Sequence, residues 1–279
     1  MTVRSRADIP TAQRIVVKVG SSSISGENAG QIAPLVDALA AAHERGTEVV
    51  LVSSGAIATG MPYLKLDERP TDLATQQAAA SVGQNLLVVR YQDALDRYGI
   101  IAGQVLLTAG DLENVTPRSN AQRAMDRLLA LRILPIVNEN DTVATHEIRF
   151  GDNDRLAALV AELIGADLLV LLSDVDALYT RPPHLDGAER IDHVPFGDEL
   201  AGIEIGSIGR AGVGTGGAET KVSAARIAAG SGAAVLITAT TLVADALAGA
   251  HIGTWFDAAP ETPAGALERH TADVAAPLA

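Results

Sequence analysis

The sequence has no cysteine, very few aromatic residues and no apolar run long enough to cross a bilayer. Without cysteine, a disulfide framework, thiolate chemistry and cysteine metal sites are all excluded. Aromatic residues make up 3% of a chain that is 48% hydrophobic, so the core is predicted to consist of Ala, Val, Leu and Ile. The polar stretch Met1 to Arg14 lacks the apolar segment of a signal peptide, and we expect a cytoplasmic location.

Positive charge is also scarce. Lys and Arg number 21 against 34 Asp and Glu, which gives a net charge of −13. Because nucleic-acid binding needs a basic surface, nucleic acid is not expected as a main partner. A chain of 279 residues is long enough to bury a substantial core.

Aliphatic segments alternate with segments of helical periodicity along the chain. The predicted strands are 14–20, 48–53, 100–108, 132–138, 167–172, 233–238 and 253–256, and the predicted helices are 31–45, 71–98, 119–132, 154–164, 219–229 and 242–248. This alternation predicts an α/β fold, a three-layer αβα sandwich around a mostly parallel sheet. We expect one domain over 1–256 and a poorly ordered tail over 257–279.

A lysine interrupts the first predicted strand. Lys18 lies in a β-branched run that begins at Arg14, and a buried ammonium group is costly unless an anion meets it. Gly20 and three serines follow at the carboxyl end of this strand, where open α/β sheets bind ligands. We therefore favour ligand contact over an edge strand with Lys18 in water.

Four glycines lie between Gly212 and Gly217, directly before the predicted helix 219–229. Backbone N–H groups at such a helix N-terminus favour an anion, and Lys221 adds a positive charge in the first turn. No hydroxyl residue follows this lysine, so the loop is not a Walker A motif, and its match to the dinucleotide fingerprint follows a poor strand. A nucleotide phosphate is the expected ligand, with a flexible linker as the alternative.

Polar residues also follow three other predicted strands and precede one predicted helix. They are Ser53 and Ser54, Asn138 to Asp141, Ser173 and Asp174, and Gly151 to Asp154. Because parallel strands end at one edge of a sheet, a single crevice can collect these groups. Two lysines with carboxylates and glycine turns suit phosphoryl transfer, and paired Asn and Asp side chains suit a free amino acid.

The long helix 71–98 carries Gln76, Gln77 and Gln84 among small residues. This face is expected to pack closely on a neighbouring element, with the lining of a site or a subunit contact as alternatives.

Five segments, in this order, resemble the amino acid kinase superfamily, and within it the kinases that phosphorylate glutamate. They are Val17 to Ser22, Ser53 to Ala58, Asn138 to Asp141, Gly151 to Asp154 and Gly214 to Lys221. The resemblance covers Arg14 to about Phe256. It implies a kinase that uses ATP and Mg²⁺ to convert L-glutamate to L-glutamyl 5-phosphate, the first step of proline biosynthesis.

The resemblance also implies roles for single residues. Lys18 and Lys221 would stabilise the transferred phosphoryl group, and Asp154 would orient both lysines. Glutamate would be held by Ser54, Asp141 and Asn153, with Asn138 nearby. The nucleotide would be bound by Lys18, Ser173, Asp174, Thr215, Gly216, Gly217, Ala218, Glu219, Thr220 and Lys221. No metal ligand from the protein is expected.

As partners, the resemblance implies L-glutamate, proline as a feedback inhibitor near Asp141 and Asn153, and a homo-oligomer, either a dimer or a tetramer. No membrane partner is expected. Ala218 stands where the superfamily commonly has Met, so the packing over the nucleotide is expected to differ. The chain ends at Ala279, too soon for the C-terminal RNA-binding-like (PUA) domain that many members carry.

Other functions remain open on the residues alone. A sibling kinase would act on N-acetylglutamate, aspartate, carbamate or a nucleoside monophosphate, but the acidic groups between Asn138 and Asp154 favour a free ammonium group. A non-catalytic amino-acid sensor would not need two lysines. A dehydrogenase would rest only on the weak glycine fingerprint.

Overall fold

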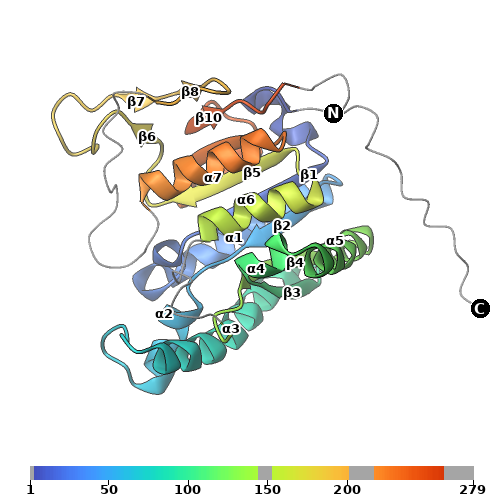
Figure 1. Cartoon of the computed structure of the whole chain (residues 1–279), viewed down its shortest axis with the longest axis vertical. Coiled ribbons are helices and arrows are strands. Elements are labelled where there is room, and N and C mark those ends of the chain that lie inside the picture. The colour runs from blue at the N-terminus through green and yellow to red at the C-terminus, as the bar shows by residue number, and fades with distance from the viewer. Residues whose placement is uncertain (1–2, 144–152, 201–216, 261–279) are drawn as a thin grey trace, which may run out of the picture.

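The computed structural model describes residues 3–143, 153–200 and 217–260. In these ranges, helices cover both faces of a central eight-stranded sheet (Figure 1). The strands are β1 (Arg14–Val19), β2 (Glu48–Val52), β3 (Ala102–Leu107), β4 (Leu134–Glu139), β5 (Leu168–Ser173), β6 (Leu178–Tyr179), β7 (Arg190–Ile191), β8 (His193–Val194), β9 (Ala234–Ala239) and β10 (Thr254–Phe256). The α-helices are α1 (Ile32–Glu44), α2 (Ala56–Gly60), α3 (Leu73–Leu95), α4 (Ala109–Glu113), α5 (Val115–Ala130), α6 (Asn153–Ile164), α7 (Ala218–Gly230) and α8 (Val243–Leu247).

The strand order in the large sheet is β3-β4-β2-β1-β5-β9-β10-β8. Neighbouring strands are parallel except β9 and β10, which run antiparallel. The predicted αβα architecture around a mostly parallel sheet is therefore confirmed. The order also puts β1 near the centre, with β2 on one side and β5 on the other, so the carboxyl ends of β4, β2, β1, β5 and β9 lie in a row.

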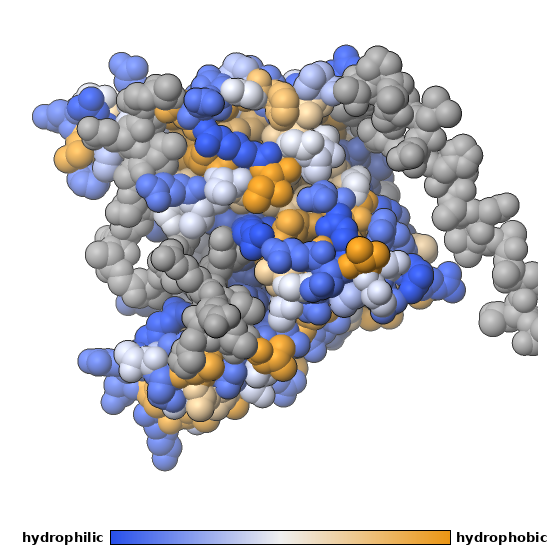
Figure 2. All heavy atoms as spheres, in the orientation of Figure 1, coloured by the Kyte–Doolittle hydropathy of each residue, from blue (hydrophilic) through white to orange (hydrophobic). Residues whose placement is uncertain are grey.

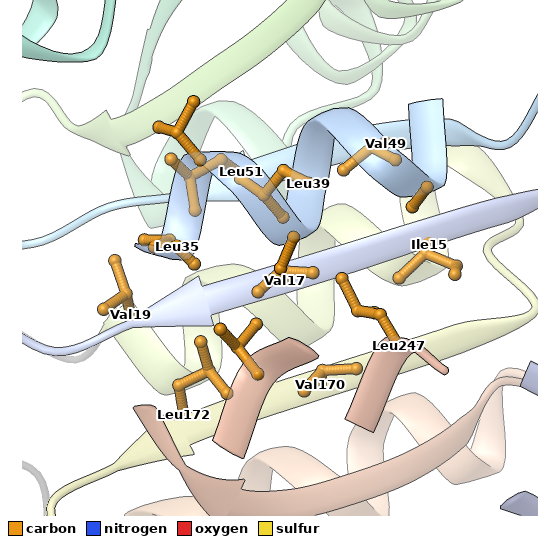
Figure 3. Close-up of a cluster of buried hydrophobic side chains, with 14 of the residues drawn as sticks. Ile15, Val17, Val19, Leu35, Leu39, Val49, Leu51, Val170, Leu172 and Leu247 are labelled. Atoms are coloured by element: carbon orange, nitrogen blue, oxygen red, sulfur yellow. The ribbon is translucent and has the colours of Figure 1, made fainter. Parts of the chain in front are cut away.

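Strand β1 divides its side chains between two cores. Ile15, Val17 and Val19 belong to the core formed with α1, α3 and α8, and Figure 3 shows the three packed among residues of β2, β5 and α1. Val16 belongs to the other core, with residues of α5, α6 and α7. Because side chains alternate along a strand, Lys18 must lie on the same face as Val16, toward α6 and α7.

Helices α2 and α3 approach each other closely because both carry glycine at the contact. A Cβ atom on Gly60 would lie 2.0 Å from the carbonyl oxygen of Ala79, and one on Gly83 would lie 1.8 Å from that of Ala56. Ala79 and Ala80 are also buried. The expected close packing of this helix face is confirmed, and the contact fixes α2, which begins directly after Ser54 and Gly55.

Several elements differ from the sequence-based expectation. Helix α5 begins at Val115, before the predicted start at residue 119, and the short helix α4 was not predicted. The described segment 181–200, where no strand was predicted, contains β7 and β8, and β8 pairs with β10 at the edge of the large sheet. These strands are two residues long, too short for a periodicity to be visible in the sequence.

The predicted tail is described only at its start. Asp257 N–H donates to the Val194 carbonyl oxygen over 3.1 Å, and Ala259 N–H donates to that of Ala229 over 2.8 Å. The boundary at Asp257 stays a prediction, because residues 261–279 lie outside the described part of the chain.

On the face of the molecule drawn in Figure 2, hydrophobic residues lie in separate groups among hydrophilic ones. In the described residues, none of the helices combines the length and the apolar character that a bilayer crossing requires.

Candidate active site

Three buried charged side chains meet at the carboxyl end of β1. Lys18 Nζ lies 2.6 Å from Asp154 Oδ1, and Lys221 Nζ lies 3.2 Å from Asp154 Oδ2. Asp154 is the second residue of α6 and Lys221 is in the first turn of α7, two helices that pack side by side over the sheet (Figure 1). The Asp154 side chain is only 1% exposed. One carboxylate thus holds two ammonium groups that come from different elements.

The beginning of α7 adds a hydroxyl group to this cluster. Thr220 Oγ1 donates to Asp154 Oδ2 over 2.9 Å and also lies 2.9 Å from the Gly217 carbonyl oxygen. Gly217 is the N-cap residue of α7, so the free N–H groups of that helix begin beside the lysines. Ala218 is buried and Glu219 is exposed. Thr215 and Gly216, also predicted to bind the nucleotide, lie outside the described residues.

Burial and neighbouring charges shift the pKa values of Asp154 and Lys221 in this cluster. Burial alone would raise the pKa of Asp154, but Lys18 and Lys221 outweigh it and hold that pKa far below its usual value. Burial and then the neighbouring Lys18 lower the pKa of Lys221, while Asp154 and Asp174 act in the opposite direction. By formal charge, one carboxylate and two ammonium groups give the cluster +1, which suits an incoming anion.

The turn after β2 lies against the turn after β1. Gly55 has a φ of 92°, and a Cβ atom there would meet the Ser21 Cβ at 3.3 Å. Ser54 is buried beside it, and its neighbour Ser53 forms a hydrogen bond of 2.9 Å with the Tyr91 hydroxyl of α3. The two predicted small-residue turns are therefore adjacent, and α3 holds one of them in place.

The carboxyl end of β4 provides amide and carboxyl groups. Asn138 is buried, its Nδ2 donates to Gln84 Oε1 over 2.6 Å, and its Oδ1 accepts the Glu139 N–H over 2.9 Å. Burial, reinforced by Glu139 and partly offset by Arg69, raises the pKa of Asp141 to about 7.

Asn153 and the end of β5 complete the site. The Oδ1 atom of Asn153 is buried and, among the described residues, has no hydrogen-bond donor. Such an acceptor is costly unless a ligand satisfies it. Ser173 Oγ donates to Asp174 Oδ1 over 3.1 Å, and Thr240 Oγ1 donates to the Ser173 carbonyl oxygen over 3.1 Å, which joins the ends of β5 and β9.

Residues 13–239 match the profile of the amino acid kinase family. The chain belongs to the amino acid kinase family. Its similarity to proteins named glutamate 5-kinase is high: those of Clavibacter sepedonicus and Leifsonia xyli subsp. xyli (strain CTCB07) are each 76% identical over 256 and 262 residues. These alignments cover 92% and 94% of this chain and 98% and 97% of those proteins.

A more distant glutamate 5-kinase, from Streptomyces coelicolor, is 57% identical over 258 residues, which are 91% of this chain and 69% of that protein. Among solved structures, carbamate kinase from Giardia lamblia bound to AMP-PNP superposes with a TM-score of 0.63 at 16% identity, covering 90% of this amino acid kinase and all of that chain (100%). At such low identity this likeness shows the fold alone.

Two buried residues of α3 in this amino acid kinase support the candidate site; the sequence indicated the Gln84 face only as an alternative lining of a site, and Tyr91 was not predicted. Gln84 and Tyr91 are seven residues apart, and they bond to Asn138 of β4 and to Ser53 after β2. A spacing of seven on one helix face was the available signal, but the polar residues of that helix gave no indication of their partners.

Proposed function

We infer that this amino acid kinase phosphorylates the γ-carboxylate of L-glutamate with ATP to give L-glutamyl 5-phosphate, in proline biosynthesis. The similarity to proteins named glutamate 5-kinase over nearly the whole chain supports the substrate and the reaction. The observation that carries the chemistry is the buried carboxylate of Asp154 between Lys18 and Lys221.

The proposed mechanism needs alignment and charge stabilisation rather than a general base. The attacking γ-carboxylate is already ionised near neutral pH. As negative charge spreads over the transferred phosphoryl group, Lys18 and Lys221 stabilise it from two sides, and Asp154 keeps both ammonium groups in position. A fixed cationic pair avoids the reorganisation that water would have to undergo at the moment of reaction.

For the amino acid, we propose contacts at Ser54, Asp141 and Asn153. The Oδ1 of Asn153, which has no hydrogen-bond donor in the described part of the chain, fits the substrate ammonium group, and an ionised Asp141 complements the same charge. Asn138 lies nearby, but its amide is already hydrogen-bonded to Gln84 and to the Glu139 backbone N–H. We therefore propose that it supports the pocket and does not contact the substrate directly.

For the nucleotide, we propose that the Gly217 end of α7, with Thr215 to Lys221, binds the phosphates, and that Ser173 and Asp174 flank them. The free N–H groups at a helix N-terminus suit phosphate oxygens. Mg²⁺ would enter with the phosphates of ATP, which with water molecules are its usual ligands.

Three further proposals rest on the resemblance. They are feedback inhibition by proline in the glutamate pocket near Asp141 and Asn153, a homo-oligomeric assembly, and a cytoplasmic location.

An acyl-phosphate trap tests the function. The protein is incubated with Mg-ATP, hydroxylamine and one of L-glutamate, N-acetylglutamate, L-aspartate or bicarbonate with ammonia, and hydroxamate and ADP are measured. Hydroxamate only with L-glutamate is expected. ADP release with another acid alone would contradict the proposed substrate, and binding of glutamate without any turnover would indicate a sensor instead.

A further inference from the structure

Gln84 is a buried polar residue that the mechanism above does not use. It is 7% exposed and lies on α3, the helix that packs against α2. Its neighbour Gly83 touches the backbone of Ala56, two residues after Ser54, and its own side chain reaches Asn138 at the end of β4. Gln84 therefore lies between the carboxyl ends of β2 and β4, at the amino-acid side of the proposed site.

The hydrogen bonds fix which way the Gln84 amide faces. A backbone N–H can only donate, so the atom of Asn138 that meets the Glu139 N–H must be Oδ1. Asn138 Nδ2 is then the atom that meets Gln84, over 2.6 Å, and it needs an acceptor. Oε1 of Gln84 must face Asn138, and its Nε2 group must face the other way.

The Nε2 group has two N–H donors to satisfy. Among the described residues it donates to no acceptor, and it is not one of the fully buried side-chain atoms that lack a partner. A donor held in a fixed direction at the edge of a buried network suits a carboxylate, since it supplies hydrogen bonds without adding charge.

The sheet order indicates which carboxylate. Strand β2 separates β4 from β1, so the backbone of β4 lies about 10 Å from that of β1 at the usual strand spacing. The reacting γ-carboxylate must lie at Lys18, beyond the end of β1. The α-carboxylate is at the opposite end of glutamate, toward β2 and β4.

We propose that Gln84 Nε2 donates to the α-carboxylate of glutamate, and that Gln84 is a specificity-determining residue for the amino acid. This inference rests on the proposed function. It also completes the recognition of an amino acid, because the acceptors at Asn153 and Asp141 suit the ammonium group whereas Gln84 offers donors to the carboxylate.

The test compares L-glutamate with 4-aminobutyrate, which is glutamate without the α-carboxylate. In the Gln84→Leu variant, kcat/KM for glutamate should fall about 10- to 100-fold, the usual effect of losing a hydrogen bond to a charged group. The affinity for 4-aminobutyrate, measured as a substrate or as a competitive inhibitor against glutamate, should change less than about twofold, and so should KM for ATP.

Two further variants keep the test decisive. Gln84→Glu retains an acceptor for Asn138 but opposes the substrate carboxylate with a negative charge. It should therefore lower kcat/KM for glutamate at least as much as Gln84→Leu does, and it can be used if Gln84→Leu fails to fold. Gln76→Leu, a control on the same helix whose amide donates to the Pro70 carbonyl oxygen, should leave the preference between the two ligands unchanged.

The inference would be overturned if Gln84→Leu weakened 4-aminobutyrate binding as much as it lowered kcat/KM for glutamate, or if kcat/KM for glutamate did not fall. Gln84 would then be a packing residue. If the wild-type protein forms no hydroxamate with glutamate, the proposed function itself fails. The two failures are therefore distinguishable.

Discussion

The carboxylate of Asp154 holds two ammonium groups that would otherwise repel each other. Its charge is stabilised by both lysines and by the Thr220 hydroxyl, all within 3.2 Å. Removing a partner from such a buried ionic cluster leaves charge uncompensated, which costs far more than the loss of an exposed ion pair.

For Asp154→Asn, we expect a loss of about 3–5 kcal/mol in the free energy of unfolding at pH 7 and a fall of about 100- to 1,000-fold in kcat. Because the folded-state pKa of Asp154 is lowered, its stabilisation is present above the unfolded value of 3.8 and is lost as the pH falls through the folded value. Urea unfolding at several pH values measures this dependence.

The control variant is Asp37→Asn, which breaks the exposed pair with Arg97 and should cost less than about 1 kcal/mol in the free energy of unfolding. Equal losses in the two variants would contradict the role given to the cluster.

The raised pKa of Asp141 predicts that its effect on protein stability changes with pH in the direction opposite to that of Asp154. Its pKa of about 7 means that the folded protein keeps a proton that the unfolded chain releases near pH 4, so Asp141 makes the protein less stable as the pH rises between these values. Asp141→Asn should therefore raise the melting temperature more at pH 8 than at pH 5.

If ionised Asp141 binds the substrate ammonium group, KM for glutamate should fall as the pH rises from 6 to 8 (about 7 being the midpoint) in the wild type but not in the variant. A flat wild-type profile would argue against this contact.

At the residue scale, the sequence predicts much of the cluster. A lysine within a β-branched run and a lysine after a glycine loop are each unusual enough to indicate an anion site, and Lys18 and Lys221 do meet at one carboxylate. The partners of Gln84 and Tyr91 could not be predicted, because they lie 54 and 38 residues away along the chain. Only the fold brings those pairs together.

At the scale of elements, the contact between α2 and α3 decides where the Ser54 turn lies. Gly83→Ala should force the two helices apart, since the new Cβ atom would meet a backbone carbonyl oxygen rather than a flexible side chain. We expect a loss of about 1–3 kcal/mol in the free energy of unfolding, together with a higher KM for glutamate. Gly30→Ala, where no atom lies within 4 Å of the new methyl group, should stay within about 0.5 kcal/mol of the wild type. If Gly83→Ala were equally harmless, the close contact would not position the site.

Elements with a clear hydrophobic pattern were predicted well. Continuous aliphatic runs identified β1, β2, β4, β5 and β9, because strands covered on both faces have no polar side. The sequence did not indicate α4, where a capping box of Thr108 and Asp111 closes a helix of five residues. Nor did it indicate β8, whose two residues pair with β10 only through tertiary contact.

At the scale of the whole molecule, contacts just after β10 hold the chain against the domain as far as Ala259. Asp257 accepts the Trp255 Nε1–H over 3.1 Å and pairs with His193 over 2.8 Å, in addition to the two backbone bonds made by Asp257 and Ala259. A chain that stops after Phe256 should therefore lose roughly 2–4 kcal/mol relative to one that stops after Pro260, at about 1 kcal/mol per hydrogen bond. Thermal unfolding of the two truncated proteins measures this difference. Equal melting temperatures would place the functional boundary of the domain at Phe256, as the sequence alone suggested.

The shared carboxylate of Asp154 also has a consequence for how two substrates act on each other. Lys18 belongs to β1, next to the strands on the proposed amino-acid side, whereas Lys221 belongs to α7, on the proposed nucleotide side. A nucleotide that draws Lys221 toward its phosphates weakens the hold of Lys221 on Asp154 and strengthens the pairing of Asp154 with Lys18. The two half-sites are then energetically coupled, and thermodynamic reciprocity requires glutamate to change the affinity for ATP by the same factor by which ATP changes the affinity for glutamate.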